Sequence, residues 1–328
     1  METLAGILFG FTDILHLPNL SAIVLGVVIG IVFGALPGLT ATMGVAVFTP
    51  LTFSLPPEIG ISFLLGIYVG GMYGGSITAI LIRTPGTPAS VVTTFDGYTL
   101  AQKGRAGEAL YMALFSSFFG GIVSGIILIT IAPQLAKFAL KFGPAEYFAL
   151  TVFGMSIIAS VSGKRITKGL LAGLLGILLT LVGMDGVTGV DRFTFGTTVL
   201  LSGFNLIPVL IGIFAVSEVL YQVRHTELDG SNAGTSKSIR LDRTYIPIRE
   251  LFKYFGAMTR SSLIGTFIGV VPGTGGGIAS FIAYDVTKRV SRNAEELGNG
   301  SMEGVATAES ANNAVTGGAL VPLLTLGI

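Results

Sequence analysis

Long apolar segments, separated by short polar stretches, dominate the chain. A transmembrane helix needs about 20 predominantly apolar residues, and most of these segments are long enough to span a membrane or nearly so. The pattern therefore predicts an all-α, polytopic membrane protein. The stretch Leu39–Leu51 is too short alone and is expected to be the second half of a broken helix. The longer segments lie at about Leu20–Leu36, Ile59–Ile82, Ala109–Ala132, Ala145–Val161, Gly169–Met184, Thr198–Leu220, Ser261–Ala283 and Val305–Ile328.

Two ladders of glycines, far apart in the chain, each end in a Pro-Gly pair. A glycine at every fourth position clears one face of a helix, so that a second backbone can pack against it. The Pro-Gly pair then breaks the helix, and in lipid a broken helix is tolerated only where its freed backbone is buried in protein or lines a polar cavity. In secondary transporters that place is usually the substrate site. The ladders are Gly26, Gly30 and Gly34 before Pro37 and Gly38, and Gly265 and Gly269 before Pro272 and Gly273.

The ladders indicate an internal duplication. A shift of 235 positions (272 minus 37) superimposes them with their prolines, and a later pair, Gly74-Gly75, matches Gly317-Gly318 at a shift near 244 (318 minus 74). The polar stretch Asp229–Ser238 lies between the halves. We therefore expect a first repeat with its following helices over residues 1–228, a cytoplasmic linker over 229–257, and the start of a second repeat over 258–328. At this shift, the counterpart of Pro85 in the second repeat would come after Ile328, so we expect a C-terminally truncated sequence.

Composition supports the membrane interpretation. Of the residues, 51% are hydrophobic and 11% are charged, whereas a soluble domain carries about 25% charge. Mean hydropathy is +0.80. The absence of cysteine and the 2 histidines exclude disulfides and Cys/His metal sites, and the net charge of +1 gives no footprint for nucleic acid.

Loop charges predict the orientation. Lysines and arginines concentrate in cytoplasmic loops, so three basic loops are expected in the cytoplasm and the loop that holds Asp185 and Asp191 outside. Lys137 and Lys141 contradict this pattern. The basic loops carry Arg83, Lys103 and Arg105; Lys164, Arg165 and Lys168; and Arg224, Lys237, Arg240, Arg243, Arg249 and Lys253.

Carboxylate chemistry is expected at the breaks. A half-helix that begins after Pro-Gly presents unpaired N–H groups and the positive end of its dipole, which attract anions. Hydroxyl groups lie beside each break, and carbonyls freed near Gly38 and Gly273 could coordinate Na+. The alternative is that these pairs are packing kinks, because glycine and proline are common in transmembrane helices. The hydroxyls are those of Thr40 and Thr42, of Thr84 and Thr87, and of Thr274.

The remaining polar candidates each have a second interpretation. Arg83 could pair with a substrate carboxylate, although its place at the end of an apolar run favours an anchor at the cytoplasmic interface. Asn312 and Asn313 suit a sodium or carboxylate site, with capping or interhelical hydrogen bonding as the alternative. Glu218, Asp285 and Glu309 lie near the ends of expected segments, so interfacial solvation is favoured over a role as an intramembrane proton or cation carrier.

Several long motifs, in order along the whole chain, resemble the large membrane subunit of the tripartite tricarboxylate transporters, the TctA type. They are Gly34-Ala-Leu-Pro-Gly-Leu-Thr, Tyr73-Gly-Gly-Ser-Ile-Thr-Ala-Ile-Leu-Ile-Arg-Thr-Pro-Gly-Thr-Pro, Leu206-Ile-Pro-Val-Leu-Ile-Gly-Ile-Phe-Ala-Val-Ser-Glu, Val271-Pro-Gly-Thr-Gly-Gly-Gly and Glu309-Ser-Ala-Asn-Asn-Ala-Val-Thr-Gly-Gly.

The resemblance implies a bacterial inner-membrane symporter with two repeats in inverted topology. It would work with a small membrane subunit and a periplasmic binding protein that delivers a carboxylate such as citrate. No cofactor is implied apart from a coupling ion, Na+ or H+. Together with the breaks, it gives the expected substrate site, which comprises Pro37, Gly38, Thr40, Thr42, Ser76, Thr84, Pro85, Gly86, Thr87, Pro272, Gly273, Thr274, Gly275, Asn312 and Asn313.

Other classes of membrane protein remain open at this point. A channel could use the glycine-rich breaks as a passive filter, and a structural subunit would carry no site of its own. An intramembrane enzyme is disfavoured, because a convincing Ser-Lys pair, Asp pair or His-Glu metal motif is missing from the sequence. The glycine-rich run after Val271 lacks the Gly-Lys-Ser/Thr ending of a phosphate-binding loop.

Overall fold

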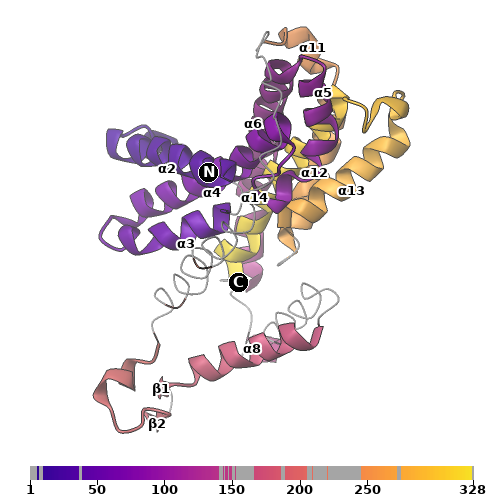
Figure 1. Ribbon diagram of the computed structural model, residues 1–328. Helices are drawn as coiled ribbons and strands as arrows, with labels where there is room; N and C mark the ends of the chain where they lie inside the picture. Colours follow the sequence, from indigo (N-terminus) through magenta and orange to yellow (C-terminus); the bar gives the residue numbers. More distant parts are fainter. Residues whose placement is uncertain are drawn as a thin grey trace.

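The computed structural model describes residues 10–36, 39–139, 166–185, 189–204, 245–271 and 275–326, with scattered positions elsewhere. Asp229–Ser238 and most of Ala145–Val161 lie outside these ranges. The described chain is almost entirely helical, which confirms the predicted all-α class (Figure 1). Its helices are α2 (Leu17–Ala35), α3 (Ala41–Thr52), α4 (Pro57–Ile82), α5 (Thr99–Gln102), α6 (Ala106–Ala139), α8 (Ile166–Thr180), α11 (Ile248–Phe252), α12 (Phe255–Val270), α13 (Gly275–Val290) and α14 (Met302–Leu326).

Short elements connect the helices. β1 (Gly183–Met184) pairs with β2 (Asp191–Arg192) as a small antiparallel ribbon. Single turns form η1 (Pro88–Ser90), η2 (Thr94–Tyr98), η4 (Thr198–Ser202) and η6 (Ala294–Glu296). η4 is a 3-10 turn, and Gly203 follows it with a φ of 70°, a conformation that stops a helix. The prediction that a membrane-spanning helix begins at Thr198 is therefore wrong.

Helices of the described chain are long and apolar enough to cross a membrane at Leu17–Ala35, Pro57–Ile82 and Ala106–Leu135. Proline occupies the first turn of α2 and of α4, where its missing N–H costs no hydrogen bond. Large apolar side chains remain exposed along α2, α6 and α8, as in Val28, Phe118 and Leu175. Such a surface suits lipid rather than water, and the chain is a membrane protein.

Both predicted helix breaks occur, and their backbones match. α2 ends before Leu36, which has φ −87° and ψ 114°, and α12 ends before Val271, which has φ −84° and ψ 112°. Each of these residues precedes a proline, and the proline ring disfavours the helical conformation for the residue before it. A new helix begins at Ala41 in the first case and at Gly275 in the second.

The glycine ladders pack as predicted, and in the same way in both halves. A Cβ on Gly30 or Gly34 would collide with the carbonyl oxygen of Ile67 or Gly71 in α4. A Cβ on Gly265 or Gly269 would meet the carbonyl oxygen of Ala311 or Val315 in α14. The glycines of the two pairs are 235 positions apart and their partners 244 positions apart, so the structure repeats both sequence offsets.

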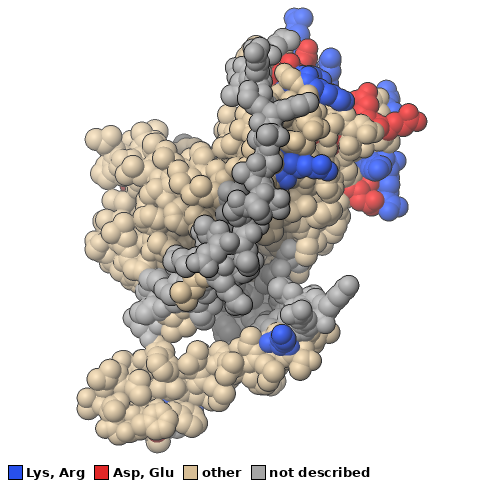
Figure 2. Space-filling view, viewed as in Figure 1, with Lys and Arg blue, Asp and Glu red and all other residues tan. Residues whose placement is uncertain are grey.

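α14 lies at the centre of the helical body, in contact with α4, α6, α12 and α13 (Figure 1). An apolar core between α5, α6, α11, α12 and α14 contains Leu100, Met112, Leu251, Met258 and Val305. Charged side chains gather at one end of this body, near α5, α11 and the end of α13, while the flanks shown are largely uncharged (Figure 2). There Lys103 Nζ donates to the backbone oxygen of Asn299 at 2.6 Å.

Candidate functional site

The first break and the segment after α4 fold onto each other. α4 ends at Ile82. The next residue, Arg83, has a φ of 58° that turns the chain, and Pro85 prevents the helix from continuing. The Gly86 N–H donates to the Gly75 carbonyl at 3.3 Å, and a Cβ on Gly86 would collide with the carbonyl oxygen of Gly34 at the end of α2. Only glycine fits this crossing. The end of α2 and the segment that follows α4 are therefore in close backbone contact.

The second break meets the same region through α14. A Cβ on Gly276, in the first turn of α13, would meet Asn312 Oδ1, the Met72 side chain and Ala89 in η1. Asn312 Nδ2 donates to the Met72 carbonyl at 3.4 Å, while its Oδ1 has no hydrogen-bond partner although the residue is fully buried. Elements far apart in sequence thus converge on Asn312.

The other predicted site residues fall into distinct groups. Thr40 caps α3 by accepting from the Met43 N–H at 3.2 Å, and Ser76 Oγ donates to the Tyr73 carbonyl at 2.7 Å, so both have local structural roles. Thr87 is buried and shares a hydrogen bond of 2.9 Å with Ser90. Thr84, three residues before Thr87, is exposed. Pro37, Gly38, Pro272, Gly273 and Thr274 lie outside the described residues, as does the carbonyl coordination of Na+ expected near Gly38 and Gly273.

A cavity of about 660 Å³ lies between the two broken regions. Thr42 and Tyr68 line it from the first half, and Gly275 and Val315 from the second. Gly275 has a φ of 66° and begins α13, so the unpaired N–H groups of the first turn of that helix lie at this cavity. Its volume is within the range of small-molecule sites.

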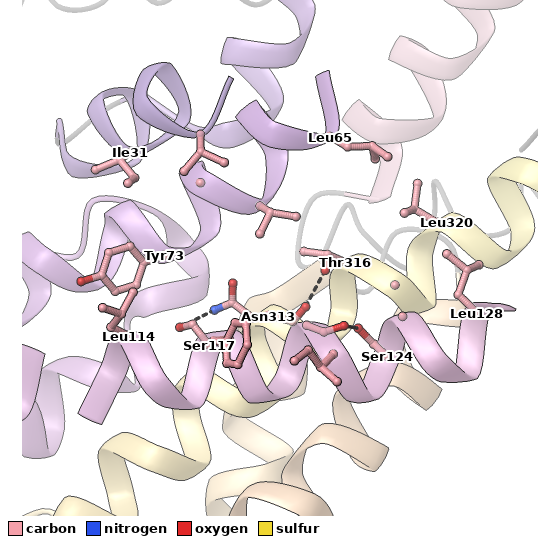
Figure 3. A pocket seen from close by; sticks show the side chains of 18 residues that line it. Ile31, Leu65, Tyr73, Leu114, Ser117, Ser124, Leu128, Asn313, Thr316 and Leu320 are labelled. Carbon is pink, nitrogen blue, oxygen red and sulfur yellow. Dashed lines mark hydrogen bonds between the residues drawn. The ribbon is translucent and has the colours of Figure 1, made fainter. Parts of the chain in front are cut away.

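A second cavity, of about 520 Å³, lies between α2, α4, α6 and α14. Aliphatic side chains such as Ile31 and Leu128 form most of its wall, and Ser117, Asn313 and Thr316 supply polar groups from α6 and α14 (Figure 3). Asn313 Nδ2 donates to Ser117 Oγ at 2.8 Å and to the Glu309 carbonyl at 3.2 Å. Asn313 therefore lines this cavity, whereas Asn312, the preceding residue of α14, contacts Met72 and the first turn of α13.

Glu309 contradicts the prediction of interfacial solvation. It is 0% exposed, because the helix begins at Met302, earlier than the expected Val305, and places Glu309 in its third turn against α6. Its Oε1 accepts from Thr93 Oγ1 at 2.5 Å and its Oε2 from Ser117 Oγ at 3.0 Å. Asp285 does remain solvated, in an exposed ion pair with Arg289. Glu218 lies outside the described residues.

Arg83 does not face the converging breaks. Its guanidinium lies over the ring of Tyr98, 5.7 Å from the ring centroid. This geometry is a cation–π contact, which fits the anchoring role favoured from the sequence. Among the described residues, histidines and carboxylates form no cluster of three or more that could hold a metal ion.

Comparison with known proteins gives the family. The model of the tripartite tricarboxylate transporter TctA family matches residues 20–328. The chain belongs to the tripartite tricarboxylate transporter TctA family. The resemblance found in the motifs is thereby confirmed.

Relatives of this TctA-family chain occur in Agrobacterium vitis. One, described as an uncharacterized 52.8 kDa protein in the TAR-I ttuC' 3' region, is 40% identical over 328 residues, which cover 100% of this chain and 64% of the relative. Another, an uncharacterized protein in the TAR-II ttuC' 3' region, is 53% identical over 64 residues, 20% of this chain and 26% of the relative. The chain thus spans somewhat less than two thirds of the first relative. No solved structure matches it.

This TctA-family chain contains a second buried carboxylate that the sequence did not single out. Asp96 Oδ1 accepts from the backbone N–H groups of Gly298, Gly300 and Ser301 at 2.7–2.9 Å, and Oδ2 accepts from Tyr284 OH at 2.6 Å. These bonds tie η2 to the loop that enters α14. Asp96 therefore has a structural role, because its hydrogen bonds fix the start of α14 relative to η2.

Sequence reasoning also missed Ser117 and Thr93, the two partners of Glu309. Both are more than 190 positions from it in the chain, so local spacing carried no signal for their contact. Glu309 itself stands four residues before Asn313, a spacing that places both side chains on one helix face. That spacing was the signal available for joining the acid to the predicted asparagines.

Proposed function

We propose that this chain is the membrane-embedded transport unit of a tripartite system that takes up a tricarboxylate, such as citrate, or a related carboxylate. The observation that carries the proposal is that both broken regions meet at Met72 and Ala89. Ala41, which begins the helix after the first break, packs with these two residues, and a Cβ on Gly276, after the second break, would meet both of them and Asn312. Broken helices that meet inside a membrane protein are the usual site for an anionic substrate in secondary carriers.

The carboxylate would bind in the cavity between the breaks. The N-terminus of α13 supplies N–H groups and a positive dipole end, and Thr42 lies in the lining. Asn312, which contacts the first turn of α13 at Gly276, offers an amide. The residues predicted from the sequence and not described, Pro37, Gly38 and Pro272 to Thr274, belong to the same proposed site, as do Thr40, Ser76, Thr84, Pro85, Gly86 and Thr87. One repeat would move against the other, in inverted topology, to expose the site alternately to each side.

The partners and the energy source belong to the same proposal. A small membrane subunit would pack against a lipid-facing flank, and a periplasmic binding protein would deliver the substrate at the outer face of the bacterial inner membrane. Uptake would be coupled to entry of Na+ or H+. The family match to residues 20–328 supports this assembly.

Uptake of labelled citrate into proteoliposomes tests the function. The vesicles would contain the full-length protein and its small subunit, with or without the binding protein, under an imposed Na+ or H+ gradient. Uptake that needs the binding protein and stops when the gradient is dissipated would support the carrier. Uptake independent of both would indicate a channel, and no uptake of any carboxylate by correctly assembled protein would indicate a structural subunit.

A further inference from the structure

Glu309 has no positively charged partner among the described residues of the helical body. It receives one hydrogen bond on each carboxylate oxygen, both from neutral hydroxyl groups. In the described part of the chain, no lysine or arginine forms an ion pair with it. A buried carboxylate without a counter-charge is costly, and acids inside membrane proteins commonly bind the protons or cations that are transported.

The amide of the neighbouring Asn313 indicates whether the site suits a proton or a metal cation. Both hydrogen bonds of Asn313 Nδ2 go to acceptors, Ser117 Oγ and the Glu309 carbonyl, which fixes the amide orientation. Asn313 Oδ1 then has no partner, although the residue is 1% exposed, and Figure 3 shows this oxygen pointing into the cavity, away from Ser117. A proton on Glu309 would leave that oxygen unpaired, whereas a metal cation is held by several oxygens at once.

The ligands favour a monovalent cation. Calcium takes six to eight oxygen ligands and commonly several carboxylates, and magnesium demands a near-ideal octahedron. Here one carboxylate is joined by hydroxyl and amide oxygens, and among the described residues no group of three acids or histidines exists. A single positive charge balances this set, and sodium is the common cation held by carbonyl and carboxylate oxygens in secondary carriers.

We propose that Glu309, Ser117, Asn313 and Thr93 form the binding site for one sodium ion. This inference rests on the proposed function, because uptake coupled to the ion gradient is the process that would use it. It moves the expected sodium site from the backbone near Gly38 and Gly273 to side chains of α6 and α14 and the segment before η2. Asn312, which precedes Asn313 in α14, contacts Met72 of α4 and the first turn of α13 after the second break, so one helical turn joins the ion to the proposed substrate site.

Direct binding of radioactive sodium to the purified full-length protein tests the site, with potassium as the background salt. Wild type should bind sodium saturably, near one ion per chain. Glu309→Gln keeps the side-chain shape and should abolish saturable binding, and Asn313→Val and Ser117→Ala should weaken it about 10- to 100-fold, the usual cost of losing a group that shapes an ion site. Asp285→Asn removes an exposed carboxylate from α13 and should leave binding at the wild-type level.

A folding control keeps the result interpretable. Each variant would be compared with wild type by gel filtration and by melting temperature in potassium, and sodium should raise the melting temperature of wild type but not of Glu309→Gln. If Glu309→Gln does not fold, the sodium affinities of Asn313→Val and Ser117→Ala test the site instead. Wild-type affinity in folded Glu309→Gln, or in both of the others, would overturn the site.

The binding assay separates this inference from the proposed function. Sodium binding that depends on Glu309 in a protein that transports no carboxylate would uphold the site and contradict the function. Uptake driven by a proton gradient alone, with no sodium binding by wild type, would uphold carboxylate transport and overturn the sodium site.

Discussion

The helix pairs α2–α4 and α12–α14 meet through the same backbone contacts but present different side chains at equivalent positions. In each pair, two glycines of the first helix lie against carbonyl groups of the second, at positions related by shifts of 235 and 244. Applied to α4, the second shift places Leu65, Tyr68, Val69 and Met72 on Glu309, Asn312, Asn313 and Thr316 of α14. One copy is apolar or aromatic at these positions, and the other carries an acid, two amides and a hydroxyl.

The surroundings account for this difference. α14 is enclosed by α4, α6, α12 and α13, so its polar groups can find partners such as Ser117 and Thr93. In α4 the equivalent face is less enclosed, and Val69 is 40% exposed, where an amide would face lipid or an apolar cavity wall. Duplication thus supplies two similar scaffolds, and burial decides which of them can hold polar chemistry in a membrane.

The shared packing should be the most sensitive feature, and equally so in both copies. Gly30→Leu and Gly265→Leu each force a side chain into a facing carbonyl group, which should cost about 3 kcal/mol or more because backbone rather than a mobile side chain blocks the new atoms. We expect little folded protein from either, measured as the monodisperse fraction after purification. Gly176→Leu, at a site with open space in α8, is the matched control. A folded Gly265→Leu beside an unfolded Gly30→Leu would break the equivalence.

The convergence of the breaks should be the next most sensitive feature. Gly276→Ala places a methyl group on Asn312 Oδ1 and the Met72 side chain, so we expect uptake per folded molecule to fall about 10- to 100-fold, or roughly 1.4–2.8 kcal/mol. Gly256→Ala is the control, because the added methyl group would lie in open space beside α12. Equal uptake by the two variants would remove Asn312 and Gly276 from the proposed site.

Exchanging one polar residue for its counterpart sharpens the comparison. Asn313→Val copies Val69 into α14 and should raise the sodium concentration for half-maximal uptake about tenfold, since loss of one ligand of about 1.4 kcal/mol corresponds to that factor. Val69→Ala should leave it unchanged. The assay is uptake as a function of external sodium. An unchanged sodium dependence in Asn313→Val would show that the amide takes no part in coupling.

The smallest effect is expected at the other buried carboxylate. Tyr284→Phe removes one of four donors to Asp96 and leaves the three backbone N–H groups. We expect a loss of about 1 kcal/mol in stability, seen as a small drop in melting temperature, with unchanged uptake per folded molecule. Loss of uptake without loss of stability would assign Asp96 a functional rather than a structural role.

Much of the fold followed from local sequence. Prolines and glycines act on their immediate neighbours, so the breaks after Leu36 and Val271 and the packing of Gly30 and Gly265 could be predicted without knowledge of the rest. The individual contacts of Thr40 and Thr84 were not predictable in this way, because a hydroxyl beside a break can cap a helix, as in Thr40, or be exposed, as in Thr84.

The centre of the candidate site could not be read in the same way. Whether Glu309 is solvated or buried depends on where α6 packs and on partners as distant in sequence as Thr93. A mixed polar and apolar segment such as α14 resembles the entry to a membrane helix until its neighbours are known. Side chains that gain their meaning from several packed elements are therefore the part that required the structure.

The central claim is that the two copies share a scaffold while one of them carries the coupling chemistry. The most direct measurement is citrate uptake driven by a sodium gradient, per folded molecule, for Glu309→Gln and for Val69→Asn. The second variant introduces into α4 the amide that α14 carries at the equivalent position, outside the lining of the cavity between the breaks. The account predicts that uptake is lost in Glu309→Gln and retained in Val69→Asn. Retained uptake in Glu309→Gln, or equal losses in both, would contradict it.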